Sequence, residues 1–220
     1  MTKFFSTESV TSVVEAMTNA QKVLFVDTPS TEHLANCITE LQAKCVECIV
    51  RDHHNVLDPQ NPREEAIKEA AELVRNLADD AIISTRDENP ACSLLMSAGE
   101  FTGVDAIVAD PDPDGLLGVM KALDITYPEL DSDAVILDGP RSEQTPERLS
   151  NFAMLLVKGM ATLPPYNPKR PEIAENAKGG LFSQFVAATQ GDAEAKSSLE
   201  AKVEQYEAGV AVAEGLVSKA

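Results

Sequence analysis

The chain has 220 residues, of which 44% are hydrophobic and 25% charged, a balance typical of a folded globular protein rather than a disordered one. Its 36 acidic residues against 18 basic ones give a formal net charge of −18. Because duplex affinity depends on neutralising phosphates, this charge disfavours long duplex nucleic acid and favours a small anionic substrate reached through metal ions, or a protein partner.

Strand-like and helix-like segments alternate along the first part of the chain. Short apolar, β-branched runs predict strands at residues 22–26, 45–51, 81–83, 104–108 and 134–137. Helical spacing of apolar residues and N-cap signals predict helices at residues 31–44, 61–77 and 90–97, and from residue 115 onward. Strand–helix units of this length predict an α/β fold: a parallel sheet with helices on both faces.

The last part of the chain has a different character. Residues 164–171 are dense in proline and lack periodicity, and the remainder is rich in alanine and glutamate with helical spacing. We therefore expect an α/β domain over residues 1–160, followed over residues 161–220 by a connector and a helical tail. The tail can pack on that domain or on a partner, and a homo-oligomer through the C-terminal helices is one such arrangement.

Targeting signals and cysteine usage indicate a cytoplasmic protein. The first residues lack the basic and apolar regions of a signal peptide, and no apolar run reaches the length of a membrane span. Cys45 and Cys48 form a C-x-x-C pattern, but it leads directly into a strand and no second pair exists for zinc. We interpret them as reduced strand cysteines.

The strand at residues 45–51 ends in Asp52-His53-His54, which holds two of the three histidines of the chain. Aspartate and histidine are common ligands of divalent metals. In open α/β sheets, ligands bind at the carboxyl ends of the strands. Other expected strands also end in an acid, at Asp27, Asp110 and Asp138. These ends predict a cluster of acids and histidines at one edge of the sheet.

The segment from Asp110 to Gly115 carries three acids at alternate positions, Asp110, Asp112 and Asp114. In an extended segment these side chains share one face, where unpaired carboxylates would repel one another. A divalent cation removes that repulsion, and Gly115 permits a tight turn into a helix. The segment matches the start of an EF-hand loop, but the twelfth position is Lys121 instead of glutamate, and a strand precedes it.

Together these motifs resemble those of the DHH phosphoesterase superfamily, and within it the RecJ-like exonucleases and nanoRNase-type enzymes. Residues 107–115 resemble its first motif, Asp27 the acid of its second and residues 52–54 its third. In the family the first motif precedes the third, whereas here it follows, so the chain resembles a circularly permuted catalytic domain. Asp87 and Asp138 are the candidates for the acid of the fourth motif.

The resemblance covers roughly residues 20–140 and implies two Mn²⁺ or Mg²⁺ ions that hydrolyse a phosphoester. It implies Asp112 and Asp114 as ligands, Asp27 as the carboxylate that bridges the ions, and His53 as a further ligand. Asp52 would orient His53 or act as a ligand itself.

The other site residues have more open roles. His54 would bind the substrate phosphate or protonate the leaving oxygen. Asp110 would be a ligand or would support the turn. Arg141, which follows the strand expected to end at Asp138, is the predicted phosphate clamp.

The expected function is therefore a metal-dependent phosphoesterase acting on short oligonucleotides or small nucleotides. The alternative is a catalytically weakened DHH-like scaffold that binds a protein partner. A family II inorganic pyrophosphatase ranks below both, because Val108 occupies the position where that branch has a histidine.

Overall fold

The computed structural model describes residues 3–6, 14, 19–54, 64–110, 112–163 and 171–217. The chain divides into two compact units, residues 1–141 and residues 142–220. The sequence placed this boundary after residue 160. It lies earlier because helix α6 (Asn151–Ala161) packs with the helices that follow it and forms the second unit with them.

The first unit contains a five-stranded sheet with the strand order β1-β5-β2-β3-β4. Each neighbouring pair is parallel. The strands are β1 (Lys3–Ser6), β2 (Lys22–Val26), β3 (Glu47–Asp52), β4 (Asp80–Ile83) and β5 (Ala106–Ala109). Because all five strands run in the same direction, their carboxyl ends meet at one edge of the sheet.

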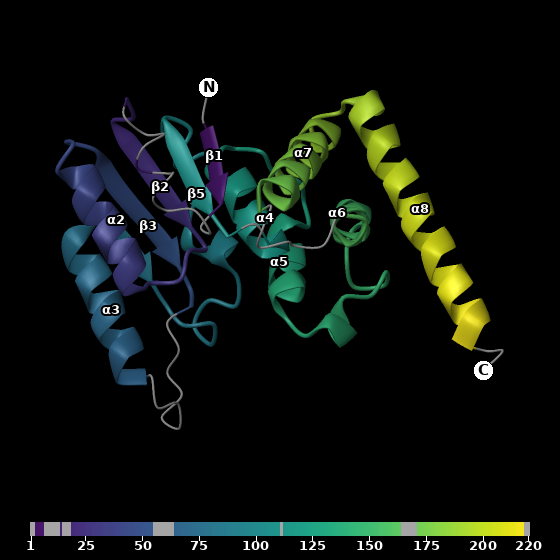
Figure 1. Cartoon of the computed structure of the whole chain (residues 1–220), viewed down its shortest axis with the longest axis horizontal. Coiled ribbons are helices and arrows are strands. Elements are labelled where there is room, and N and C mark those ends of the chain that lie inside the picture. The colour runs from purple at the N-terminus through teal and green to yellow at the C-terminus, as the bar shows by residue number, and fades with distance from the viewer. Residues whose placement is uncertain are drawn as a thin grey trace. The chain divides into compact units, whose positions relative to one another are not determined.

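Helices cover both faces of the sheet, which confirms the predicted α/β fold. Figure 1 shows α2 (Glu32–Gln42) and α3 (Glu64–Leu77) on one face, and α4 (Pro113–Ala122) and α5 (Leu130–Asp138) on the other. The strands β2, β3 and β5 are consequently buried on both faces and have nearly continuous apolar sequences. Only the edges of the sheet remain for binding and chemistry.

The predictions for two segments were wrong. Residues 134–137 were expected to form a strand but belong to α5, where Leu130, Ala134 and Leu137 are buried. Their spacing of four and three residues is that of a helix face, which a four-residue apolar run does not reveal by itself. The helix expected at residues 90–97 is reduced to one 3₁₀ helix, Cys92–Leu95.

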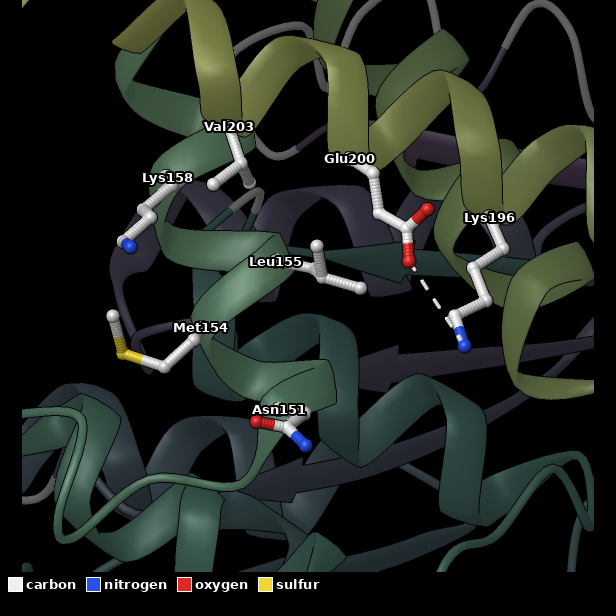
Figure 2. A pocket seen from close by; sticks show the side chains of 7 residues that line it. All are labelled: Asn151, Met154, Leu155, Lys158, Lys196, Glu200 and Val203. Atoms are coloured by element: carbon white, nitrogen blue, oxygen red, sulfur yellow. Dashed lines mark ion pairs between the residues drawn. The ribbon is translucent and has the colours of Figure 1, made fainter. Parts of the chain in front are cut away.

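The second unit is helical and consists, in its described residues, of α6, α7 (Pro171–Thr189) and α8 (Ala193–Val217). Phe152 and Phe185 join α6 to α7 in an edge-to-face ring contact with centroids 6.4 Å apart. A pocket of about 300 Å³ is lined by residues of α6 and α8. Figure 2 shows the side chains that line it, among them Met154, Leu155 and Val203. Farther along α8, Tyr206, Val210 and Val212 are exposed.

The four cysteines are free thiols. Cys48 lies in β3, while Cys45 is exposed in the turn before it. Burial, and then the charge of Glu40, raises the pKa of Cys37 to about 12. Burial, and then the charge of Asp79, raises the pKa of Cys48 to about 12 as well. Separately, none of the helices formed by the described residues combines the length and the apolar character needed to cross a membrane.

Candidate metal centre

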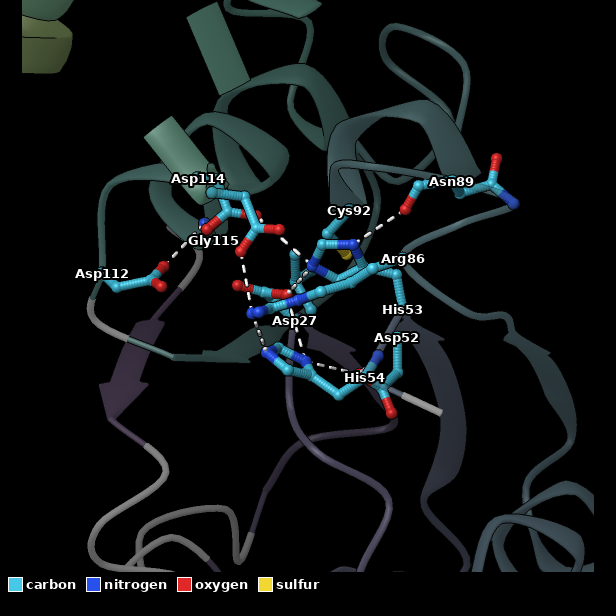
Figure 3. A network of polar contacts seen from close by, with 12 residues as sticks. Asp27, Asp52, His53, His54, Arg86, Asn89, Cys92, Asp112, Asp114 and Gly115 are labelled. Atoms are coloured by element: carbon cyan, nitrogen blue, oxygen red, sulfur yellow. Dashed lines mark hydrogen bonds and ion pairs between the residues drawn. The ribbon is translucent and has the colours of Figure 1, made fainter. Parts of the chain in front are cut away.

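The carboxyl ends of β2 and β3, the start of α4 and the end of α5 bring acids and histidines together (Figure 3). Three overlapping groups could each hold a metal ion, with donor atoms within 4.8 Å of one another. The groups are Asp27, His53 and His54; His53, Asp114 and Asp138; and Asp27, Asp112 and Asp114. Asp27, His53 and Asp114 each belong to two groups, so neighbouring ions would share ligands.

Asp27 is at the centre of this arrangement and is fully buried. Its backbone adopts φ 55°, in the left-handed region, and its N–H donates to the carbonyl of Arg51 at 2.8 Å. A left-handed conformation costs an L-residue about 1–2 kcal/mol, and such strain is concentrated at functional sites. Among the described residues, neither carboxylate oxygen of Asp27 has a hydrogen-bond partner.

His53 is held in an orientation typical of a metal ligand. Its Nδ1 lies 2.9 Å from the carbonyl oxygen of Asn89, to which it can donate. Its Nε2 therefore faces the cluster, 3.0 Å from Oδ1 of Asp27 and 3.5 Å from Oδ2 of Asp114. A backbone carbonyl on the far ring nitrogen fixes the orientation of many metal-binding histidines. Burial acts to lower the pKa of His53, but contacts with Asp114 and Asp27 raise it to about 10.

The start of α4 delivers Asp112 and Asp114. Asp112 is the N-cap, and its Oδ1 accepts the N–H of Gly115 at 3.0 Å. A Cβ at Gly115 would lie 2.6 Å from the carbonyl oxygen of Asp110 and 2.9 Å from Oδ2 of Asp27, so only glycine fits. Burial, and then the charges of Asp114 and Asp27, raise the pKa of Asp112 to about 9. These crowded carboxylates would be stabilised by a cation.

Asp52 hydrogen-bonds His54, whereas the sequence predicted that it would orient His53 or act as a metal ligand itself. Its Oδ1 accepts the N–H of His54 at 3.0 Å and lies 2.9 Å from Nδ1 of the same residue. Its Oδ2 accepts the N–H and the hydroxyl of Ser30, at 3.0 and 2.9 Å. Both oxygens have protein partners, and Asp52 lies outside the three candidate ligand groups.

Asp110 and the fourth acid also have defined positions. Asp110, half-buried after β5, is outside the three ligand groups, and its carbonyl lies against Gly115. Asp138 reaches the cluster from the end of a helix rather than from a strand. Asp87 is exposed in a turn and is not a member of any group. Of the two acids considered for the fourth motif, Asp138 is the one at the site.

The arginine beside the cluster is Arg86, which the sequence analysis missed. Its Nη2 lies 3.1 Å from Nε2 of His54 and 2.8 Å from Oδ1 of Asp138. The predicted clamp, Arg141, is instead exposed in the 3₁₀ helix Arg141–Glu143, and no described contact joins it to the cluster. The only sequence signal for Arg86 was a basic residue soon after a strand, at the edge where the acids converge.

Donor groups that share carboxylate and imidazole ligands are typical of sites with two metal ions, which activate water and stabilise a reacting phosphoryl group. The three groups combine carboxylate oxygens with imidazole nitrogens and contain no thiolate, a donor set suited to a divalent cation. No family model, no curated protein and no solved structure matches this chain.

Proposed function

We propose that the protein is a metal-dependent phosphoesterase that hydrolyses phosphoester bonds in short oligonucleotides or small nucleotides. One observation carries the proposal. Four buried side-chain atoms in one cluster form no hydrogen bond among the described residues: both carboxylate oxygens of Asp27, Nε2 of His53 and Oδ2 of Asp114. The contacts described for these atoms are to the cluster's own side chains, with Nε2 of His53 3.0 Å from Oδ1 of Asp27 and 3.5 Å from Oδ2 of Asp114. Buried polar atoms are rarely left without partners, and a bound cation would supply them.

The residues present fit two divalent ions. Asp27, Asp112 and Asp114 would hold one ion, and His53, Asp114 and Asp138 the other. Asp27 would be shared between the two ions, because its Oδ1 also lies 3.0 Å from Nε2 of His53. When bound, Mn²⁺ or Mg²⁺ would supply a water of lowered pKa and would neutralise charge on the reacting phosphoryl group.

His54 is suited to proton transfer next to these ligands. Asp52 holds its Nδ1, its Nε2 lies 3.1 Å from Nη2 of Arg86, and 19% of its side chain is exposed. A histidine whose far nitrogen is fixed by a carboxylate can take up or release a proton at the other nitrogen. We assign His54 to protonation of the leaving oxygen, supported by Asp52.

The substrate class follows from charge. The net charge of −18 repels long nucleic acid, so a short anion drawn in by local cations is favoured over an extended duplex. Short oligonucleotides and small nucleotides meet this condition.

The alternative is a scaffold that binds a protein partner or a second copy of the chain. The exposed apolar residues of α8, Tyr206, Val210 and Val212, favour it. The scaffold proposal differs in stoichiometry, because a weakened site would bind fewer than two ions.

The test is Mn²⁺-dependent release of mononucleotide or phosphate from short oligonucleotides, cyclic dinucleotides and nucleoside 3′,5′-bisphosphates. The wild type should turn over at least one of these, and Asp114→Asn should not. Calorimetric titration with Mn²⁺ should give two ions per chain. Equal rates for wild type and variant on every substrate, with fewer than two ions bound, would favour the scaffold.

A further inference from the structure

Arg86 lies beside the metal centre and contacts two of its residues, His54 and Asp138. Figure 3 shows its side chain reaching across the cluster, with its guanidinium beside His54. The same nitrogen, Nη2, contacts both Nε2 of His54 and Oδ1 of Asp138. The hydrogen bond and the ion pair described for its guanidinium both use Nη2, and 52% of the side chain is exposed.

The partner that Arg86 holds is itself a candidate ligand. Asp138 shares a ligand group with His53 and Asp114, and only 9% of its side chain is exposed. Arg86 and a metal ion would therefore draw on the same carboxylate. A divalent ion carries twice the charge of a guanidinium and is bound by further acids, so its charge would neutralise Asp138 and weaken the pairing of Asp138 with Arg86.

We propose that Arg86 is the phosphate-binding residue of this site, held by Asp138 until the metal takes that carboxylate. With Asp138 bound to a metal ion, the guanidinium would lose its anionic partner and would remain beside Nε2 of His54, which lies 3.1 Å from Nη2. Guanidinium binds phosphate through two parallel hydrogen bonds, which a released Arg86 can supply with nitrogens that now face solvent. Metal binding thereby prepares the site for the substrate.

This inference rests on the proposed function but makes separate predictions. Removing the charge of Arg86 should have opposite effects on two ligands: metal binding should strengthen and phosphate binding should weaken. A residue with a merely structural role would weaken both. Arg86→Lys keeps the charge but cannot form the paired hydrogen bonds, so it should change phosphate binding alone.

The experiment is calorimetry on the full-length protein, first with Mn²⁺ alone and then with inorganic phosphate in saturating Mn²⁺. For Arg86→Gln we expect Mn²⁺ to bind about two- to fivefold more tightly, as for loss of a competing exposed ion pair. Phosphate should bind about 10- to 100-fold more weakly, as for loss of a paired, charge-assisted hydrogen bond. Arg86→Lys should bind Mn²⁺ like the wild type and phosphate at least several-fold more weakly.

Two further variants complete the design. Arg148→Gln removes an exposed arginine that pairs with Glu143 in the second unit, and it should match the wild type in both titrations. Arg141→Gln tests the clamp expected from the sequence. Weaker phosphate binding in Arg141→Gln with wild-type binding in Arg86→Gln would overturn the inference. So would weaker Mn²⁺ binding in Arg86→Gln.

The outcomes separate this inference from the proposed function. If the wild type binds no Mn²⁺, the proposed metal centre fails and the inference fails with it. If the wild type binds two ions and cleaves a substrate while both Arg86 variants behave like the wild type, only the role of Arg86 is refuted. If the Arg86 variants bind phosphate more weakly, kinetics with phosphate monoesters and diesters should show the loss mainly in KM, as expected for a substrate-binding residue.

Discussion

Replacement of Asp27 by asparagine should have opposite effects on stability with and without metal. Asp27 is fully buried, lacks hydrogen-bond partners for both oxygens among the described residues and belongs to two of the three ligand groups. Burial, the largest effect on this group, raises the pKa of Asp27. An uncharged asparagine has the shape of the carboxyl without its charge, so the metal-free variant should melt no lower than the metal-free wild type.

With metal, the wild type should gain much more than the variant. At 1 mM Mn²⁺ and an assumed Kd of about 10 μM, each ion stabilises the fold by about 2.7 kcal/mol, so two ions contribute about 5 kcal/mol. At about 2–4 °C per kcal/mol for a chain of this size, the midpoint should rise by roughly 10–20 °C. In Asp27→Asn the rise should shrink to a few degrees, because the shared carboxylate is gone. Asp138→Asn, which changes only one of the three ligand groups, should keep about half of the wild-type rise in melting midpoint.

Thermal melting in chelator and in 1 mM Mn²⁺ measures both effects, and Asp87→Asn is the matched control. Asp87 is exposed, carries the same charge and lies one residue from Arg86, yet it is outside every ligand group. Its melting midpoint should rise with Mn²⁺ as in the wild type. A full rise in Asp27→Asn, or a drop of several degrees in chelator for that variant alone, would refute the assignment of Asp27 as a shared ligand.

Three further outcomes are expected. Mn²⁺ affinity should rise with pH between pH 6 and pH 9, because the pKa values of His53 and Asp112 are raised to about 10 and about 9 and the metal must displace their protons. Titration in buffers of different ionisation enthalpy should show this proton release, and an affinity that does not change with pH would contradict the prediction. Gly115→Ala should lose Mn²⁺ binding in the same titration and unfold about 1–3 kcal/mol more easily in urea. At pH 8 the exposed Cys45 should react with a thiol reagent well before the three buried cysteines, because the raised pKa values of those three keep their thiols protonated. Rapid modification of all four cysteines would contradict the burial of Cys37, Cys48 and Cys92.

The site residues that could be predicted from the sequence are those whose position depends on local sequence pattern and on strand direction. Asp27 and His53 follow short apolar runs, and parallel strands place their carboxyl ends together whatever the details of packing. Asp112 and Asp114 could be placed because Gly115, directly after them, permits the tight turn and the close approach to Asp110 and Asp27 that the start of α4 requires. These features depend on local pattern and on the direction of strands.

The rest depended on tertiary contacts. The short run at residues 134–137 is compatible with a strand or a buried helix, and only its packing as part of α5 decides between them. Asp138 therefore lies at the site as the last residue of a helix, whereas the sequence predicted it at the end of a strand. Arg86 was missed because a long side chain can reach many places from one position, so its partners cannot be read from spacing. The hydrogen bonds of Asp52 to His54 and Ser30 likewise needed the folded backbone.

The parallel sheet also bears on how such a site can change during evolution. The edge where Asp27, His53 and Asp114 meet does not depend on which strand the chain visits first, because every strand arrives there in the same direction. Moving the ends of the gene to another connection would alter the order of the motifs and leave the donor atoms in place. Selection that acts only on the chemistry of the site would therefore not distinguish between these motif orders. Relatives of this chain would be recognised by the spatial set of carboxylates, imidazole and guanidinium, even where the linear order of their motifs differs.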